Sequence, residues 1–230
     1  MDKHALIVGC SDGIGLGVAR VLLRDGCLVT GVSRSPSALA HERYEHAVFD
    51  VTAPDYATSL SALVGRRGPV DVCVYCAGIG ELFADAGMAA DPRVFQVNLV
   101  GAAITAEVVI PPMLQAGAGH FVGLSSLADA FASRDAPSYA ASKAGLSSYL
   151  VGLALALRGR GVYVTNVRFG FVDTKMAKSG SKPFVMPVEQ ACAVVLRAMA
   201  KPRIRVTAPR ITGILALILA LATRLRIAFS

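Results

Sequence analysis

The stretch "HALIVGCSDGIGLGVARVLLRDG", residues 4–26, decides the fold class of this 230-residue chain. Its apolar start is typical of a buried strand, and a glycine-rich turn leads directly into a helical pattern over 13–25. Gly9, Gly13 and Gly15 have the spacing G-x-x-x-G-x-G. Glycines allow a sharp turn and the close approach of a pyrophosphate, which the free N–H groups of a helix N-terminus would bind. The stretch therefore predicts dinucleotide binding after the first strand, with a plain tight turn as the alternative.

Strand and helix patterns alternate along the rest of the chain. Seven short apolar runs are typical of strands, at 4–9, 27–33, 46–51, 70–76, 120–126, 162–169 and 203–208. Helical patterns lie near 13–25, 54–65, 88–117, 137–158 and 187–200. Strands that are apolar almost throughout indicate a parallel sheet covered by helices on both faces. We therefore expect a single α/β domain over 1–230, a doubly wound, Rossmann-type parallel sheet with ligands beyond the carboxyl ends of its strands.

Composition and charge limit the classes of function. With 54% hydrophobic and 17% charged residues, the chain can bury a substantial core. Residues 1–150 carry ten Lys/Arg and fourteen Asp/Glu, a net charge of −4, whereas 151–230 carry thirteen and two, a net charge of +11. A basic half suits nucleic acid, membrane phospholipid or a phosphorylated ligand. The sequence has no helix-turn-helix, zinc-finger or RNA-binding signature, so we expect no nucleic-acid partner.

The cysteine pattern indicates reduced thiols. An odd number of cysteines with no secretory leader favours a cytoplasmic protein. The motif CVYC at 73–76 has redox-pair spacing, but it lies in an apolar run whose positions three apart point to opposite faces of a strand. The histidines show no metal-ligand spacing with the cysteines, so we expect buried thiols and no metal. The cysteines are Cys10, Cys27, Cys73, Cys76 and Cys192.

The end of the second strand bears on cofactor choice. An acidic residue there would bind the ribose 2′-hydroxyl of NAD, but this chain has Ser33 and Arg34. An arginine pairs with a 2′-phosphate, so we expect NADP(H) rather than NAD(H). A solvated surface arginine is the alternative, and Asp12 places a negative charge in the phosphate-binding turn.

A second motif lies in "PSYAASKAG", residues 137–145, where Tyr139 stands four positions before Lys143. The pair alone does not distinguish a proton donor beside a lysine from an ordinary helix residue. Positions four apart share one face of a helix, so the phenol and the ammonium can point into one cleft. A nearby ammonium and the positive charge of oxidised nicotinamide would both lower the pKa of the tyrosine from about 10 and favour phenolate.

Several motifs in order give the chain a family likeness. With the glycine turn, Ala77-Gly78 after the fourth strand, Asn98, and Ser125-Ser126 after the fifth strand, the tyrosine–lysine motif resembles the short-chain dehydrogenase/reductase family. The likeness runs from about residue 4 to 176 and fits the compact branch of that family. It implies an oxidoreductase that transfers hydride between a nicotinamide cofactor and a small carbonyl or alcohol substrate.

The resemblance implies that Ser126, Tyr139, Lys143 and Asn98 are catalytic. Ser126 is preferred to Ser125 because it precedes Tyr139 by thirteen residues, the usual interval in the family. Ser126 and Tyr139 would hydrogen-bond the carbonyl oxygen, and Tyr139 would donate its proton. Lys143 would hold the nicotinamide ribose and, with Asn98 and water, reload the tyrosine. The alternatives are that Ser126 only caps a strand end and that Asn98 only satisfies helix backbone.

Other motif positions extend the predicted cofactor site. Asp50-Val51 resembles the pair beside the adenine ring, Cys76 stands where the family usually has asparagine, and Phe169 stands where it usually has proline. Thr174 and the backbone of Val172 would lie near the nicotinamide carboxamide. With the glycine turn, the predicted cofactor-binding residues are Gly9, Ser11, Asp12, Gly13, Ile14, Gly15, Ser33, Arg34, Asp50, Val51, Cys76, Ala77, Gly78, Tyr139, Lys143, Gly170, Val172 and Thr174.

Two C-terminal segments carry weaker signals. Residues 171–188 are expected to cover the substrate. Phe171, Met176, Phe184 and Met186 suit an apolar carbonyl compound, with simple core or lid packing as the alternative. Residues 210–230 join an apolar run, too short to span a bilayer, to flanking arginines. We expect a helix packed on the domain or on a subunit, with a membrane surface as the less favoured alternative.

The resemblance also implies a homodimer or homotetramer formed through the helices near 98–117 and 137–158. The alternative function is a non-catalytic protein that binds NADP(H) as a sensor or scaffold.

Overall fold

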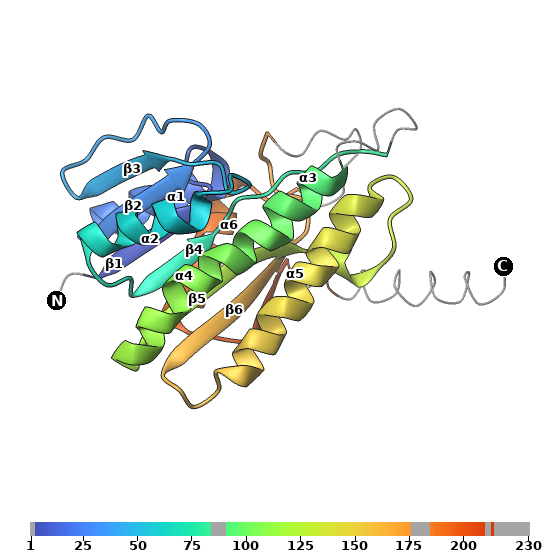
Figure 1. Cartoon of the computed structure of the whole chain (residues 1–230). Coiled ribbons are helices and arrows are strands. Elements are labelled where there is room, and N and C mark those ends of the chain that lie inside the picture. Colours follow the sequence, from blue (N-terminus) through green and yellow to red (C-terminus); the bar gives the residue numbers. More distant parts are fainter. Residues whose placement is uncertain (1–2, 84–90, 176–184, 210–212, 214–230) are drawn as a thin grey trace.

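The computed structural model describes residues 3–83, 91–175, 185–209 and 213 of the chain. Its centre is a seven-stranded sheet with the order β3-β2-β1-β4-β5-β6-β7 (Figure 1). Every neighbouring pair of strands is parallel, which confirms the predicted sheet. The strands are β1 (His4–Val8), β2 (Leu28–Ser33), β3 (Tyr44–Val48), β4 (Val72–Tyr75), β5 (Gly119–Ser126), β6 (Val162–Phe169) and β7 (Arg205–Ala208).

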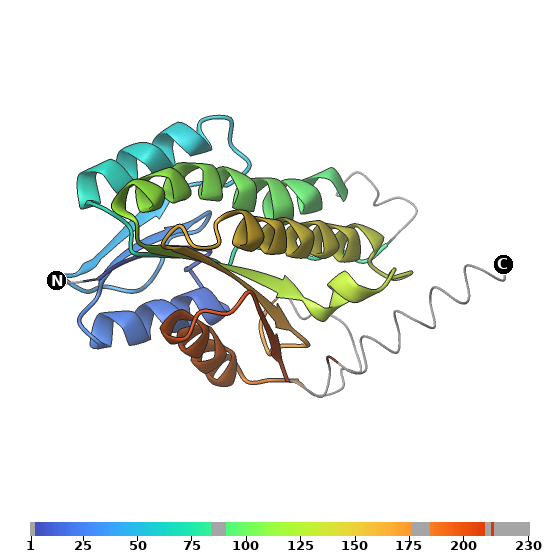
Figure 2. The same ribbon diagram turned by 90° about the horizontal axis from the view of Figure 1, so that it is seen from below.

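Helices cover both faces of the sheet. Figure 2 shows α1 and α6 on one face and α2, α4 and α5 on the other. The helices are α1 (Gly13–Arg24), α2 (Tyr56–Arg67), α3 (Asp91–Phe95), α4 (Gly101–Ala116), α5 (Pro137–Ala156) and α6 (Val188–Ala200), with the short turns η2 (Gln96–Val100) and η3 (Leu127–Ala130). The strand order reverses between β1 and β4, which places the switch point of the doubly wound sheet there.

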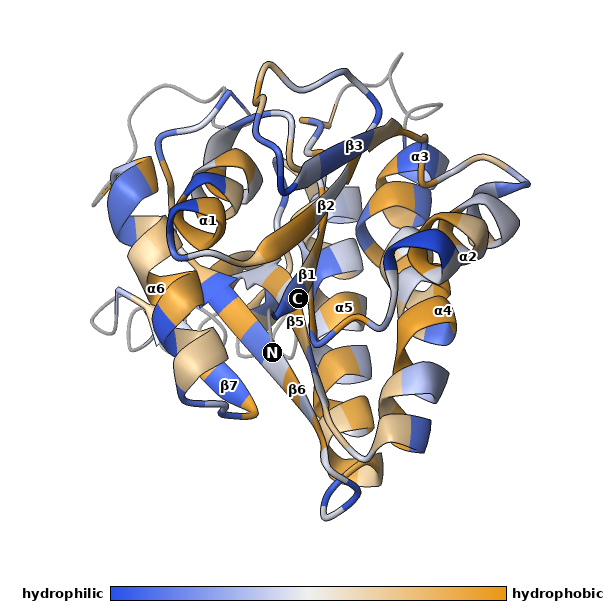
Figure 3. Ribbon diagram, turned by 90° about the vertical axis from the view of Figure 1, so that its left-hand side faces the viewer, coloured by the Kyte–Doolittle hydropathy of each residue, from blue (hydrophilic) through white to orange (hydrophobic). Residues whose placement is uncertain are grey.

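Strand β1 shows why a strand without polar alternation is stable here. Leu6 and Val8 pack into the core beneath α2, α4 and α5, whereas Ala5 and Ile7 pack into the core beneath α1 and α6. Successive side chains of a strand point to opposite faces, so a strand with two covered faces is apolar throughout. In Figure 3 the inner strand β2 is largely hydrophobic, whereas the edge strand β3 is largely hydrophilic.

The helix predicted near 88–117 has an interruption that its periodicity does not reveal. The π-helical turn η2 separates α3 from α4, and the N–H of Gly101 donates to the carbonyl of Gln96, five residues earlier. Single π turns often occur at functional sites. Residues 91–116 are also, by length and composition, apolar enough to span a membrane. Half of their most apolar stretch is buried inside the domain, as in the core helix of a folded domain.

Two sequence predictions fall wholly or partly on residues that are not described. Of the predicted substrate-covering segment, only 171–175 and 185–188 can be placed, where Val172 and Met186 form a single parallel bridge. The predicted C-terminal helix at 210–230 lies outside the described residues except for Gly213.

Candidate active site

The glycine turn after β1 is packed against the turn after β4. Gly9 has a φ of +88°, and a Cβ on it would lie 2.5 Å from the backbone nitrogen of Ala77. A Cβ on Gly15 would lie 2.1 Å from the carbonyl oxygen of Gly9. Neither position accepts a side chain without a shift of backbone, so the sequence spacing reflects real close approaches.

Asp12 occupies the N-terminus of α1. Its carboxylate accepts a hydrogen bond from the N–H of Gly13 at 2.8 Å and forms an ion pair with Lys175 at 2.6 Å. The hydrogen bond from Lys175, followed by that from Gly13, lowers the pKa of Asp12. Lys175 therefore offsets the negative charge in the turn and joins it to the segment after β6.

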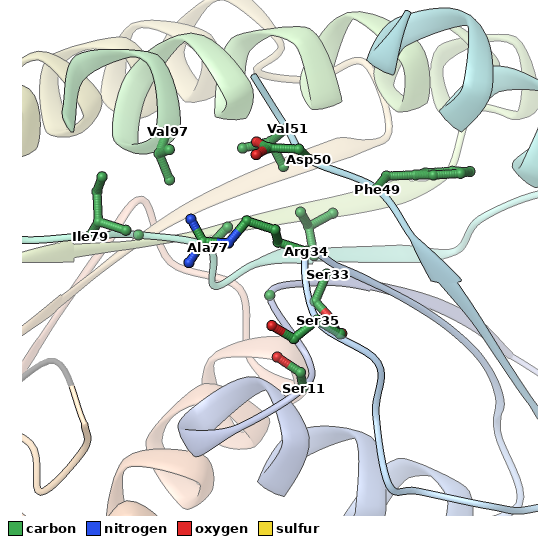
Figure 4. Close-up of a pocket in the computed structure, with 13 residues that line it drawn as sticks. Ser11, Ser33, Arg34, Ser35, Phe49, Asp50, Val51, Ala77, Ile79 and Val97 are labelled. Carbon is green, nitrogen blue, oxygen red and sulfur yellow. Dashed lines mark hydrogen bonds between the residues drawn. The ribbon is translucent and has the colours of Figure 1, made fainter. Parts of the chain in front are cut away.

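A hollow at the switch point collects residues from five parts of the chain (Figure 4). Eight of the predicted cofactor residues line it. Figure 4 shows the side chain of Arg34 extending from the end of β2 into the hollow. The lining residues are Val8, Gly9, Ser11, Ser33, Arg34, Ser35, Phe49, Asp50, Val51, Ala77, Gly78, Ile79 and Val97. Val8, Ser35, Phe49, Ile79 and Val97 were not predicted to bind cofactor, although each lies close in sequence to a predicted residue.

Asp50 is held in place at the rim of this hollow. It pairs with Arg93 at 2.8 Å and accepts hydrogen bonds from the N–H and hydroxyl of Thr52. Burial disfavours ionisation, but the Thr52 hydrogen bonds and the Arg93 charge together hold the pKa of Asp50 below its ordinary value. The carboxylate is therefore ionised and oriented before any ligand binds.

Some predicted residues lie outside the hollow. Cys76 packs in the core beneath α1 and α6, and burial raises the pKa of its thiol well above the ordinary value. Thr174 lies beside the glycine turn, where its methyl group would be 3.4 Å from a Cβ on Gly13. Phe169 continues β6 in register with Ser126 and Ala208, so the residue in place of the usual proline extends the strand.

Ser126, Tyr139 and Lys143 meet at the carboxyl end of β5. Ser126 ends β5, whereas Tyr139 and Lys143 lie on one face of α5. The Nζ atom of Lys143 is 5.7 Å from the centroid of the Tyr139 ring and donates to the carbonyl of Leu124 at 2.9 Å. The Tyr139 ring also lies against Gly80, where an added Cβ would be 3.3 Å from a ring carbon. The structure thus brings the three predicted residues together, and their catalytic roles stay a prediction.

The pKa values of these groups follow from their burial. Burial lowers the pKa of Lys143 to about 8, while the Asp129 carboxylate opposes that shift. Burial also raises the pKa of Tyr139, a hydrogen bond with Ser126 lowers it, and Asp129 raises it. In the chain by itself desolvation outweighs the favourable contacts, so the pKa of Tyr139 is raised. The predicted lowering also depends on the charge of oxidised nicotinamide and stays a prediction.

Asn98 lies in η2 and is completely buried, and its side-chain amide forms hydrogen bonds with two other segments of the chain. Its Oδ1 accepts from the N–H of Ile79 at 2.8 Å, and its Nδ2 donates to the carbonyl of Ile79 and to the hydroxyl of Ser142, both at 2.9 Å. Ser142 in turn donates to the carbonyl of Tyr139. Asn98 thus links the turn after β4 to α5, and its role in a proton path stays a prediction.

Ser126 has the capping role that was the alternative for it. Its hydroxyl oxygen accepts from the N–H of Ala128 at 3.2 Å and caps η3. A hydroxyl that accepts one hydrogen bond still has a hydrogen to donate, so capping and a contact with Tyr139 coexist.

Sequence reasoning missed a charged pair next to this site. Asp129 in η3 and Arg168 in β6 form an ion pair whose side chains are only 4% and 13% exposed. The available signal was an acidic residue and a basic residue in otherwise apolar or small-residue segments, because buried charges require partners.

Comparison with known proteins agrees with this geometry. The family described as short chain dehydrogenase matches residues 3–183. An uncharacterised oxidoreductase of Myxococcus xanthus is 32% identical over 222 residues, which cover 90% of this chain and 87% of the relative. The chain belongs to the short-chain dehydrogenase family. It is therefore an oxidoreductase of a family whose members act on small molecules.

Other members of the short-chain dehydrogenase family give the wider setting. A ketoacyl reductase of Nostoc is 32% identical, with 84% of this chain and 74% of the relative covered. A Burkholderia cenocepacia short chain dehydrogenase in complex with NADP superimposes with a TM-score of 0.86 at 22% identity, over 98% of this chain and 95% of that one. A 4-hydroxyisoleucine dehydrogenase complexed with NADH has a TM-score of 0.79 at 18% identity, over 90% and 97%. The two structures show that the fold is shared, and their cofactors differ.

Proposed function

We propose that this short-chain dehydrogenase is an NADP(H)-dependent carbonyl reductase, or the corresponding alcohol dehydrogenase, with Tyr139 as its general acid and base. The observation that carries the proposal is the meeting of Ser126, Tyr139 and Lys143 at the carboxyl end of β5, on the edge of the sheet where the cofactor hollow opens. Such a grouping suits proton transfer to an oxygen that gains charge during reduction.

The residues of the hollow fit the adenosine end of a dinucleotide. Because Gly9 has no side chain, the backbone of the first turn packs directly against that of Ala77. No side chain at Gly9 then obstructs a dinucleotide that lies along this turn. Ser33 and Arg34 stand at the end of β2 on the hollow's edge, where the ribose of a dinucleotide would lie. The glycine turn and the N-terminus of α1 would hold the pyrophosphate. NADP(H), when bound, supplies or accepts the hydride.

Arg34 supports the preference for NADP(H) over NAD(H). Its side chain is exposed, it lines the hollow, and residues 33–35 contain no carboxylate to bind a bare 2′-hydroxyl. A guanidinium binds a phosphate through two parallel hydrogen bonds. The ion pair of Asp12 with Lys175 also offsets the one acidic charge in the phosphate turn.

The chain's own groups would then manage the proton. Ser126 and Tyr139 would donate hydrogen bonds to the carbonyl oxygen, and Tyr139 would transfer its proton to that oxygen as reduction proceeds. Lys143, with a pKa near 8, is charged at neutral pH and would stabilise the phenolate that remains. Burial raises the pKa of Tyr139, which favours the protonated phenol that a general acid requires.

Exposed apolar side chains support an apolar carbonyl substrate. Leu82 and Phe83 follow β4, and Phe171 and Val185 flank the segment after β6; all four are more than 40% exposed. Phe83 is fixed by its N–H, which donates to the carbonyl of Asp135 just before α5. Apolar walls with few polar groups are typical of sites for small organic substrates.

Assembly and location remain proposals of the same kind. Exposed Val100 and Leu155, at the ends of the long α4 and α5 segments, support a homodimer or homotetramer formed through these helices. Five free cysteines support a reducing, cytoplasmic setting. Light scattering after size-exclusion chromatography would contradict the assembly if the chain eluted as a monomer at micromolar concentration.

The test is Tyr139→Phe, with turnover of ketones by NADPH followed at the nicotinamide absorbance. The variant should bind NADPH with nearly unchanged affinity and lose at least about 100-fold in kcat, since a general acid contributes that much. Tyr149→Phe is the matched control, because Tyr149 lies on the same helix outside the cleft and should change neither quantity. Near-normal turnover in Tyr139→Phe would contradict the proposal.

The alternative of a non-catalytic sensor predicts a different result. A panel of ketones and alcohols with NADPH and NADH would then give binding of the nucleotide without oxidation or reduction of any substrate. The presence of both Tyr139 and Lys143 in one cleft favours the enzyme.

A further inference from the structure

A buried polar cluster lies behind the catalytic helix and is not explained by cofactor binding or by the proposed proton transfer. Arg168 on β6 donates from Nε to Oδ2 of Asp129 at 2.7 Å and from Nη2 to Oδ1 of the same carboxylate. The contact is bidentate, and both side chains are largely removed from water. Bidentate arginine–carboxylate pairs are the most directional of the ion pairs found in proteins.

The cluster continues through two serines into the catalytic helix. Ser147 on α5 donates to Oδ2 of Asp129 and lies 2.7 Å from the hydroxyl of Ser125 on β5. Ser125 donates to the carbonyl of Lys143 at 3.2 Å. One connected set of hydrogen bonds therefore joins β5, η3, α5 and β6.

The ends of this set are the elements that carry the proposed chemistry. Ser126 lies between Ser125 and η3 in the chain, and Asp129 is the third residue of η3. The ion pair of Asp129 with Arg168 therefore fixes the position of η3. Lys143 lies four residues before Ser147 on the same face of α5. The relative position of the Ser126 hydroxyl and the tyrosine–lysine pair is thus set by the cluster rather than by α5 alone.

The cluster also brings charge close to the catalytic tyrosine. The groups that act on Tyr139 are Lys143 on its own helix, Ser126 at the end of β5 and Asp129 in η3. Arg168 on β6 pairs with Asp129. Cys76, which directly follows β4, also raises the pKa of Lys143. Asp129 disfavours the phenolate of Tyr139, and Arg168 compensates the charge of Asp129.

We propose that Asp129 and Arg168 form a positioning pair for the carbonyl reduction proposed above, one that holds Ser126 in register with Tyr139 and Lys143 and balances the charge beside the tyrosine. Neither residue touches substrate or cofactor in this role. The pair acts through Ser147, Ser125 and the electrostatic field at the tyrosine hydroxyl.

If the pair balances charge beside Tyr139, removing one partner should shift the pKa of Tyr139 in a direction set by the charge that remains. A purely structural role predicts no such dependence on the sign of the charge. Asp129→Asn leaves a cation near Tyr139 and should lower its pKa, whereas Arg168→Met leaves an anion and should raise it. A single charge acting over a few ångströms in a partly buried site shifts a pKa by on the order of one unit. The double variant removes both charges and should return the pKa towards that of the native chain.

The experiment measures the tyrosine directly and does not depend on turnover. Tyrosinate absorbance is recorded against pH, and the signal of Tyr139 is obtained by subtracting the same titration of a matched Tyr139→Phe protein. The chain has no tryptophan to obscure that absorbance. The pH profile of alcohol oxidation is measured in parallel and should move in the same direction as the titration in each variant.

Opposite shifts for Asp129→Asn and Arg168→Met, with recovery in the double variant, are the expected result. Shifts in the same direction, or loss of turnover with no shift, would overturn the proposal. If Arg168→Met does not fold, Asp129→Asn is compared with the double variant, and equal tyrosine pKa values in those two would overturn it. Arg168→Lys should keep the native pKa, because it keeps the charge.

One control and one outcome separate this inference from the proposed function. Glu45→Gln breaks ion pairs between β3, at the opposite edge of the sheet, and Arg66 and Arg67, and it should leave both the titration and the pH profile unchanged. If the native protein turns over no ketone or alcohol, the proposed function fails. The tyrosine titration would still show whether the pair balances charge at Tyr139.

Discussion

Replacement of Asn98 by leucine is expected to destabilise the protein through the loss of three specific hydrogen bonds. Asn98 is completely buried and bonds to the N–H and carbonyl of Ile79 and to the hydroxyl of Ser142. Leucine nearly matches asparagine in shape, so little cavity or strain is introduced. At about 1 kcal/mol of net stability for each hydrogen bond, the loss is about 3 kcal/mol.

Asn166 provides a matched control on β6. It too is completely buried, but within the described residues neither polar atom of its side chain has a hydrogen-bond partner. Asn166→Leu therefore removes an unsatisfied amide and should leave the free energy of unfolding unchanged or raise it by about 1 kcal/mol. Both variants gain the same leucine, so their difference isolates the bonds of Asn98.

The assay is urea unfolding followed by far-UV circular dichroism, because the chain has no tryptophan for fluorescence. For a protein of this size, 3 kcal/mol corresponds to a fall in Tm of about 6–12 °C, which thermal melts would confirm. If Asn98→Leu and Asn166→Leu have the same free energy of unfolding within about 1 kcal/mol, the hydrogen bonds of Asn98 do not hold the turn after β4 to α5.

Three other substitutions test separate parts of the structure. Arg34→Asp should reverse the preference between cofactors, with at least about a tenfold fall in the ratio of kcat/KM for NADPH to that for NADH, because a carboxylate repels a 2′-phosphate and binds a 2′-hydroxyl; an unchanged ratio would contradict the assignment. His120→Gln should make the protein more resistant to acid, because burial lowers the pKa of His120 to about 4 from 6.5, so the native chain loses up to about 3 kcal/mol as pH falls from 6.5 to 4. Thermal melts at pH 7 and pH 4.5 should show the smaller loss of Tm in His120→Gln, and equal losses would refute the explanation; glutamine can keep the hydrogen bond to Thr165. Gly15→Ala should weaken NADPH binding at least about tenfold, measured by nucleotide fluorescence, because its Cβ would lie 2.1 Å from the carbonyl oxygen of Gly9 and must displace the turn; an unaltered Kd would show that the turn adapts.

The parts of the candidate site that could be predicted are those whose residues lie close together in the sequence. The glycine turn stands at a strand–helix junction, and Tyr139 and Lys143 share a helix face, so local geometry alone places their side chains. Ser33 and Arg34 were predicted at the ligand end of β2 because parallel strands end at one edge. These predictions needed only the order of the elements.

Other features depend on contacts between distant residues. The ion pair of Asp129 with Arg168 joins residues 39 positions apart, and the bonds of Asn98 to Ile79 and Ser142 span 19 and 44 positions. The raised pKa of Tyr139 results from burial by the whole site, which no local spacing expresses. Cys76 turned towards the α1–α6 core, away from the hollow it was predicted to line.

The amino-acid sequence by itself determined the layered α/β architecture, because strands apolar on both faces and amphipathic helices can bury their surfaces only in that arrangement. It also determined which short motifs stand at the ligand edge of the sheet. Only the tertiary structure decided the π turn at η2, the pKa shifts of Tyr139 and Lys143 and the charged cluster behind α5. Each of these depends on desolvation and on partners that the chain brings together only when it folds.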